Sequence, residues 1–60
     1  MYLVYDKSRK KYYNGLEWVD HQRDGMKMTM PRAQEILESI MLHVSKGFMS
    51  GEYEIQEEIS

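Results

Sequence analysis

The chain begins with an unbroken apolar run, Tyr2-Leu3-Val4-Tyr5, that has no polar face. Aromatic and β-branched residues favour strands, and a strand with two apolar faces is usually covered on both sides. The run therefore predicts a buried first strand, followed by a polar turn over residues 6–9. Alternation along the strand separates Leu3 and Tyr5 on one face from Tyr2 and Val4 on the other.

A β-hairpin is predicted next, because two strand-like runs, 10–13 and 16–19, flank the dipeptide Asn14-Gly15. Asn-Gly favours a two-residue type I′ turn, in which both central residues have positive φ. Such a turn pairs the last residue of one strand with the first of the next, Tyr13 with Leu16. The predicted core face carries Tyr13, Leu16 and Trp18, and the opposite face carries Tyr12 and Val19.

The second half of the chain predicts one helix and one or two further strands. Alternating Met26, Met28 and Met30 suggest a short fourth strand. Pro31 suits the first turn of a helix and Gly47 its end, so a helix is predicted over about residues 31–46. Its apolar stripe consists of Ala33, Ile36, Leu37, Ile40, Met41 and Val44. Residues 52–59 alternate again, as in a half-exposed final strand.

These elements predict a single α+β domain over residues 1–60. The expected architecture is a small curved antiparallel sheet of about four strands, with one amphipathic helix packed on one face, in the order β-β-β-(β)-α-β. The absence of cysteine excludes disulfides and thiolate metal sites and fits a reducing cytosol. No run is long enough for a membrane span and no signal peptide is evident, so a cytoplasmic protein without a membrane partner is expected.

The width of the predicted sheet indicates a homodimer. Four strands make a sheet nearly 20 Å wide, whereas one helix is about 10 Å across. The second face of the sheet also carries apolar residues: Tyr2, Val4, Tyr12 and Val19. A second copy is the simplest cover, although loops and lysine stems in a monomer are an alternative. The predicted dimer interface consists of Tyr2, Tyr12, Leu42 and His43.

No pattern of catalytic or cofactor-binding residues is present, so a non-enzymatic protein without cofactor or metal is expected. The serines lack a nucleophile-elbow setting, and the four glycines are scattered rather than clustered around a phosphate. Asp20, His21 and Asp24 provide too few donors for a metal motif. The Glu35 and Glu38 carboxylates lie on the predicted solvated side of the helix, where a charged surface is the simpler interpretation.

Charge is distributed unevenly along the chain, although the net charge is only −2. Residues 1–30 carry six cations against four carboxylates, whereas residues 31–60 carry two against six. The acidic end predicts docking to a basic host-protein partner through Glu52, Glu54, Glu57 and Glu58. The alternative is a nucleic-acid-binding regulator that uses the basic hairpin, through Lys7, Arg9, Lys10, Lys11 and Tyr12.

The run Lys11–Val19, a polar loop, and Pro31–Leu37 at the start of a helix resemble small accessory proteins encoded by bacteriophages and prophages. The similarity covers about residues 2–45 and assigns no functional residue. It implies a phage-encoded protein of the host cytoplasm that inhibits a bacterial defence system, such as the Hachiman, Thoeris or CRISPR systems. Proteins of this kind act by stoichiometric binding, often as homodimers, and this is the first functional hypothesis.

Overall fold

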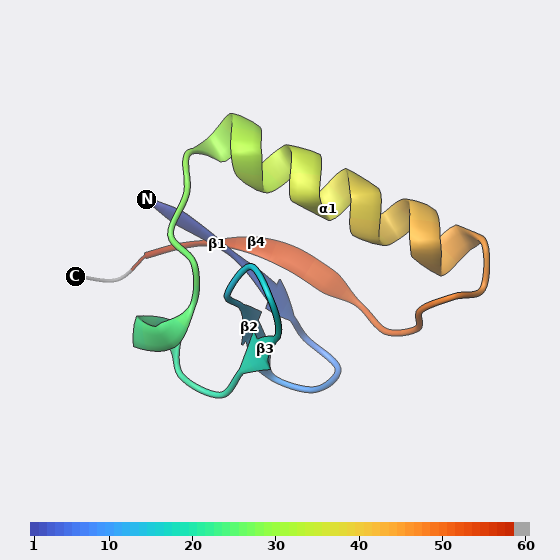
Figure 1. Ribbon diagram of the computed structural model, residues 1–60, viewed down its shortest axis with the longest axis horizontal. Helices are drawn as coiled ribbons and strands as arrows, with labels where there is room; N and C mark the ends of the chain where they lie inside the picture. Colours follow the sequence, from blue (N-terminus) through green and yellow to red (C-terminus); the bar gives the residue numbers. More distant parts are fainter. Residues whose placement is uncertain (59–60) are drawn as a thin grey trace.

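A computed structural model describes residues 1–58 and shows an antiparallel four-stranded sheet with one helix across one face (Figure 1). The predicted α+β class and its single helix on a four-stranded sheet are confirmed. The strand order is β3-β2-β1-β4. The elements are β1 (Tyr2–Asp6), β2 (Lys11–Tyr13), β3 (Trp18–Val19), a 3-10 turn η1 (Gln22–Asp24), α1 (Met30–Ser45) and β4 (Tyr53–Glu57).

Strand β1 is covered on both faces, as its sequence predicts. Val4 is fully buried against α1, in a core with Met28, Ala33 and Ile40. Leu3 is also fully buried, but on the opposite face, where Gly25 lies against it. The connection that contains η1 therefore covers part of the second face, a role that sequence reasoning left open.

The assignment of Tyr2 and Val4 to the second face was wrong. Tyr5 pairs with Tyr12, so Val4 lies beside Tyr13, on the face that α1 covers. Both Tyr2 and Val4 therefore belong to the core under the helix. The second face carries Leu3, together with Tyr5 and Tyr12, whose ring centroids are 4.8 Å apart.

The hairpin register also differs from the prediction. Tyr13 pairs with Trp18 rather than with Leu16, so the loop has four residues. The Asn14 Oδ1 atom accepts hydrogen bonds from the backbone N–H groups of Leu16 (2.9 Å) and Glu17 (2.7 Å). This side-chain turn replaces the predicted two-residue turn. In the four-residue loop the Asn14 side chain, rather than the backbone of the opposite strand, accepts the hydrogen bonds of these two N–H groups. Leu16, predicted in the core, is 95% exposed at the loop tip.

The methionine-rich segment forms one isolated bridge instead of a strand. Met28 exchanges both backbone hydrogen bonds with Tyr2, at 2.7 and 2.9 Å, and Met30 already lies in the helix. Helix α1 starts and ends one residue before the predicted bounds. Gly47, at φ 83°, closes it because Phe48 N–H reaches the His43 carbonyl and Gly47 N–H the Val44 carbonyl.

Strand β4 starts at Tyr53 and ends at Glu57, within the predicted range, and Ile59 lies outside the described residues. Tyr53 and Ile55 face the core under α1, as their alternation predicts. None of the helices found in residues 1–58 combines the length and apolarity that crossing a membrane requires.

Candidate functional site

Helix α1 packs mainly on β1 and β4. The hairpin residues Tyr13 and Trp18 also pack against the core under α1 but are only partly buried. A cavity of about 250 Å³ lies between α1 and the hairpin. We call it the aromatic groove. It is lined by Tyr13 and Trp18 of the hairpin, by Ile36, Ser39, Ile40 and His43 of α1, and by Met49.

The floor of the aromatic groove is a row of rings held by their neighbours. The Tyr13 and Trp18 centroids are 5.3 Å apart, and the Trp18 and Tyr53 centroids are 5.6 Å apart, both in tilted arrangements. Such offset geometries are favourable for aromatic pairs. The Tyr13 hydroxyl donates a hydrogen bond to the Gly15 carbonyl at 3.0 Å, which fixes the ring against the hairpin loop. The floor is therefore formed before any partner arrives.

The helical wall of the groove includes His43, and Phe48 lies beside it in the turn that follows α1. The His43 Nδ1 atom lies 2.7 Å from the Ser39 carbonyl oxygen. Because a carbonyl oxygen only accepts, Nδ1 is the donor in this geometry. The His43 and Phe48 ring centroids are 6.3 Å apart, and Phe48 is 75% exposed. The glycine turn after α1 thus holds an exposed aromatic ring beside the groove.

A second cavity, of about 280 Å³, adjoins the aromatic groove at Met49, which lines both. Its other lining residues are Arg9, Gly47, Phe48, Ser50 and Tyr53. The hydrogen bond to the Asp6 carboxylate, together with its negative charge, raises the pKa of Arg9. The two cavities therefore meet at Met49, and the second adds the half-exposed Arg9 guanidinium, which is paired with Asp6, to an otherwise largely apolar lining.

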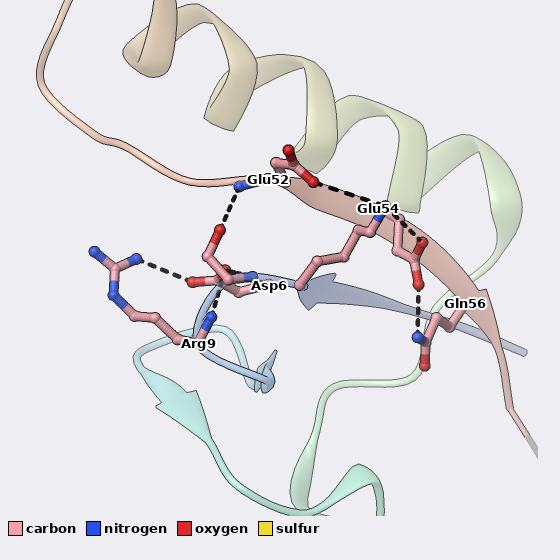
Figure 2. A network of polar contacts seen from close by, with 7 residues as sticks. Asp6, Arg9, Glu52, Glu54 and Gln56 are labelled. Carbon is pink, nitrogen blue, oxygen red and sulfur yellow. Dashed lines mark hydrogen bonds and ion pairs between the residues drawn. The ribbon is translucent and has the colours of Figure 1, made fainter.

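Asp6 organises the turn that carries Arg9 (Figure 2). It is 1% exposed, and its Oδ1 atom accepts from the backbone N–H groups of Ser8 (2.9 Å) and Arg9 (3.1 Å). Its Oδ2 atom accepts from Arg9 Nη1 at 3.0 Å. The Ser8 hydroxyl in turn accepts from the Glu52 N–H at 2.9 Å, which ties this turn to the start of β4.

Most of the predicted nucleic-acid-binding cations are engaged within the chain. Lys7 lies 3.9 Å from both Glu52 and Glu54, Arg9 pairs with Asp6, and Lys11 pairs with Asp20. Among the described residues, Lys10 alone of the four has no ion pair. Tyr12 stacks on Tyr5 instead of projecting freely. The nucleic-acid hypothesis stays a prediction, and the structure brings no open row of cations to support it.

The Lys11–Asp20 pair has a defined pH dependence. The hydrogen bond from Lys11, together with its charge, lowers the pKa of Asp20. A carboxyl pKa that is lower in the folded state stabilises the fold above the unfolded pKa of about 3.9, and this contribution is lost as the pH falls through the folded value. Asp20 is 71% exposed, so solvent screening keeps the effect small.

The four predicted docking glutamates do not form one free acidic surface. Glu52 and Glu54 share Lys7, and Glu58 lies 3.8 Å from Lys27. Within residues 1–58 only Glu57 of this set is without an ion pair, and strand alternation turns it to the other face of β4. Docking through these residues stays a prediction, but most of their charge is balanced locally.

The four predicted dimer residues lie on separate surfaces. Tyr2 packs in the core under α1, and Tyr12 lies on the opposite face of the sheet. His43 lines the aromatic groove. Leu42, one residue away on α1, is 54% exposed on the side that faces away from the sheet. The structure therefore does not bring the four together on one surface.

The prediction that Tyr13 and Trp18 lie on the core face is confirmed, since both pack against the core under α1, but it does not include the cavity beside them. Alternation gives the face of a side chain but not the element above it. The width of one helix against four strands indicates incomplete cover of the sheet, but it does not locate the cavity. Within the described part of the chain, no group of three or more acidic or histidine side chains is placed to hold a metal. Comparison with protein-family models, curated proteins and solved structures finds no match.

Proposed function

We propose that the chain is a non-enzymatic protein-binding module whose aromatic groove receives apolar side chains of a protein partner. The observation that carries this proposal is the partly buried Trp18 and Tyr13 pair beside α1, which lines a cavity of about 250 Å³. Tryptophan and tyrosine are the residues most enriched at the energetic centres of protein interfaces. Since the groove is preformed, binding needs little ordering of this chain.

The adjoining cavity specifies the chemistry of the partner segment. Arg9 lies at its end, with Nη1 engaged by Asp6 and half of its side-chain surface exposed. A segment with one or two apolar anchors and a carboxylate fits both cavities, because the anchors fill the groove and the carboxylate meets the guanidinium. The partner we propose is therefore an apolar, locally acidic segment of a larger protein.

The cellular role that we propose is stoichiometric inhibition of a bacterial defence complex by a phage-encoded homodimer in the host cytoplasm. This part of the proposal is supported by the resemblance of residues 2–45 to phage accessory proteins. Plating efficiency of a restricted phage, measured with and without the expressed chain, tests it. Restoration of plaques by the wild-type chain, and not by a groove variant, is the expected result.

The groove itself is tested with Trp18→Ala. Removal of an interface tryptophan typically costs 2 kcal/mol or more, so the partner Kd is expected to rise about 30-fold or more. The partner is a defence protein recovered with the chain, identified and purified, and titrated by calorimetry. Leu16→Ala is the matched control, because Leu16 is the most exposed large apolar residue and lies outside the groove.

A second variant separates lost binding from lost folding. Ser39→Arg fills the mouth of the groove from an exposed helical position and removes no core contact. It is expected to weaken binding while the unfolding midpoint stays near the wild-type value. Wild-type affinity in both groove variants would contradict the proposal. Trp18 is also the sole tryptophan of the chain, so its fluorescence reports occupancy of the groove directly.

A further inference from the structure

The sheet has two edges of very different length. Strand β3 has two residues, whereas β4 has five and lies at the opposite edge. The Lys7 N–H donates to the Glu52 carbonyl, and the Glu58 N–H donates to the Met1 carbonyl, both at 2.8 Å. Hydrogen bonds alternate in an antiparallel pair, so the even-numbered residues of β4 point toward β1. The N–H and C=O groups of Tyr53, Ile55 and Glu57 therefore point outward along an open edge.

An apolar stripe of α1 runs above this edge. Ile36 and His43 lie on the flank of α1 that faces the hairpin. Helical spacing places Met30, Leu37 and Met41 on the opposite flank, and Figure 1 shows β4 running beneath the helix. Met41 is 45% exposed, whereas Met30, Leu37 and Ile55 are partly buried. An open strand edge and a partly exposed apolar stripe thus lie on the same side of the molecule.

We propose that a second copy of this chain occupies this side, with the two β4 strands paired antiparallel about a two-fold axis at Ile55. The proposal rests on the homodimeric state of the proposed function and gives it an interface. Pairing joins the two four-stranded sheets into one of eight strands and satisfies the outward backbone groups. It also brings Leu37 and Met41 of both copies together above the axis.

The alternation of charged and neutral side chains selects this register. Centring on Ile55 pairs outward residues with outward residues, and it places Tyr53 opposite Glu57 of the second copy. On the other face it places Glu54 opposite Gln56 of the second copy, a pair that can share a hydrogen bond. A shift of two residues in either direction places Glu54 opposite another glutamate, either Glu54 or Glu58 of the second copy. Like charges directly opposite destabilise a strand pair.

One like-charged pair remains in the proposed register, outside the strand itself. Glu52 lies opposite Glu58 of the second copy. Each of these carboxylates already has a lysine of its own chain, Lys7 for Glu52 and Lys27 for Glu58. Their repulsion is therefore reduced at both ends of the interface. The aromatic groove lies on the other flank of α1, so the dimer leaves both grooves accessible.

Cysteine cross-linking tests the axis directly, because the native chain contains no cysteine. In a hydrogen-bonded antiparallel pair the opposed Cα atoms are about 5.5 Å apart, within the range of a disulfide. Ile55→Cys is expected to form a covalent dimer of twice 7.2 kDa under mild oxidation. Glu57→Cys is the control, since its two copies are separated by about four residues along the strands, roughly 13 Å. Equal cross-linking rates in the two variants would overturn the proposal.

Two lysine substitutions at adjacent positions of α1 test whether the apolar stripe lies in the dimer interface. Met41→Lys is expected to raise the dimer Kd at least tenfold in light scattering over a concentration series. Leu42→Lys, similarly exposed but directed away from the sheet, is expected to leave it unchanged. A wild-type chain that is monomeric at every concentration, or a dimer that Met41→Lys leaves intact, would overturn the proposal. Groove binding is read separately from Trp18 fluorescence, so a monomer that still binds its partner refutes the dimer and leaves the proposed function standing.

Discussion

Replacement of Asp6 with alanine is expected to lower the free energy of unfolding by about 2 to 4 kcal/mol. The carboxylate is 1% exposed and accepts three hydrogen bonds, two of them from backbone N–H groups of its own turn. A buried hydrogen bond to a charged group contributes about 1.5 to 3 kcal/mol to stability. The bond from the half-exposed Arg9 guanidinium to Asp6 contributes less, because solvent screens it. A domain of this size has a total stability of only about 3 to 9 kcal/mol.

The loss should spread beyond the turn because Asp6 supports two connections at once. Lys10 adopts a positive φ of 59° in this turn, a conformation that a non-glycine residue holds only when its surroundings fix it. Ser8, positioned by Asp6, accepts the hydrogen bond from Glu52 at the start of β4. Without the carboxylate, both the β1–β2 turn and the entry to β4 lose an anchor.

Urea unfolding followed by Trp18 fluorescence measures this effect, with two controls. Asp6→Asn keeps the Oδ1 acceptor but loses the charge that Arg9 requires, so an intermediate loss is expected. Asp20→Ala removes a carboxylate of an exposed ion pair, so its effect on the free energy of unfolding should be much smaller than that of Asp6→Ala. If Asp6→Ala were no more destabilising than Asp20→Ala, Asp6 would not be the organising residue of the turn.

The helix and the first strand were predictable because their signals are local and redundant. A proline at the start, a continuous apolar stripe and a terminal glycine each indicate the bounds of α1, and the structure places them within one residue. The Tyr2–Tyr5 run has no polar face, so burial on both sides was the reasonable interpretation whatever covered it. Leu3 and Val4 are accordingly both fully buried, although different elements cover them.

The hairpin register was not predictable from backbone turn preference alone. Asn-Gly favours a two-residue turn, but the Asn14 side chain here caps two N–H groups of a four-residue loop. The choice between these turns depends on which side chains each register pairs across the two strands. Pairing Tyr13 with Trp18 stacks two large rings, whereas pairing Tyr13 with Leu16 would place Trp18 opposite Lys11.

The candidate site was hidden for a different reason, because it depends on the position of α1 across the sheet. The comparison of one helix with four strands predicts that some apolar surface remains uncovered, but it does not say where. In the structure the chain from η1 to Gly25 covers the second face around Leu3, and a cavity lies beside α1 at the partly buried Tyr13 and Trp18.

Because the η1 connection buries Leu3, a substitution at Leu3 is also expected to change the stability of the protein strongly. Leu3→Ala is expected to lower the free energy of unfolding by about 2 to 5 kcal/mol, since the side chain is fully buried and its truncation leaves a cavity. Gly25→Ala should cost about 1 to 3 kcal/mol, because its new methyl carbon would lie 2.8 Å from Leu3 Cδ2 and 3.1 Å from Tyr12 Cβ. Both are measured by urea unfolding.

The double variant Leu3→Ala/Gly25→Ala separates this contact from two independent defects. Truncation of Leu3 removes the atom nearest to the new methyl group, which then occupies part of the space that the leucine leaves. The double variant is therefore expected to be more stable than the sum of the single losses predicts, by about 1 kcal/mol or more. Ala33→Gly is the control partner for Leu3→Ala, because Ala33 is equally buried but packs on the α1 side of the sheet. Additive losses in the Leu3 and Gly25 pair would mean that the η1 connection does not pack on Leu3, and that the second face of the sheet is open.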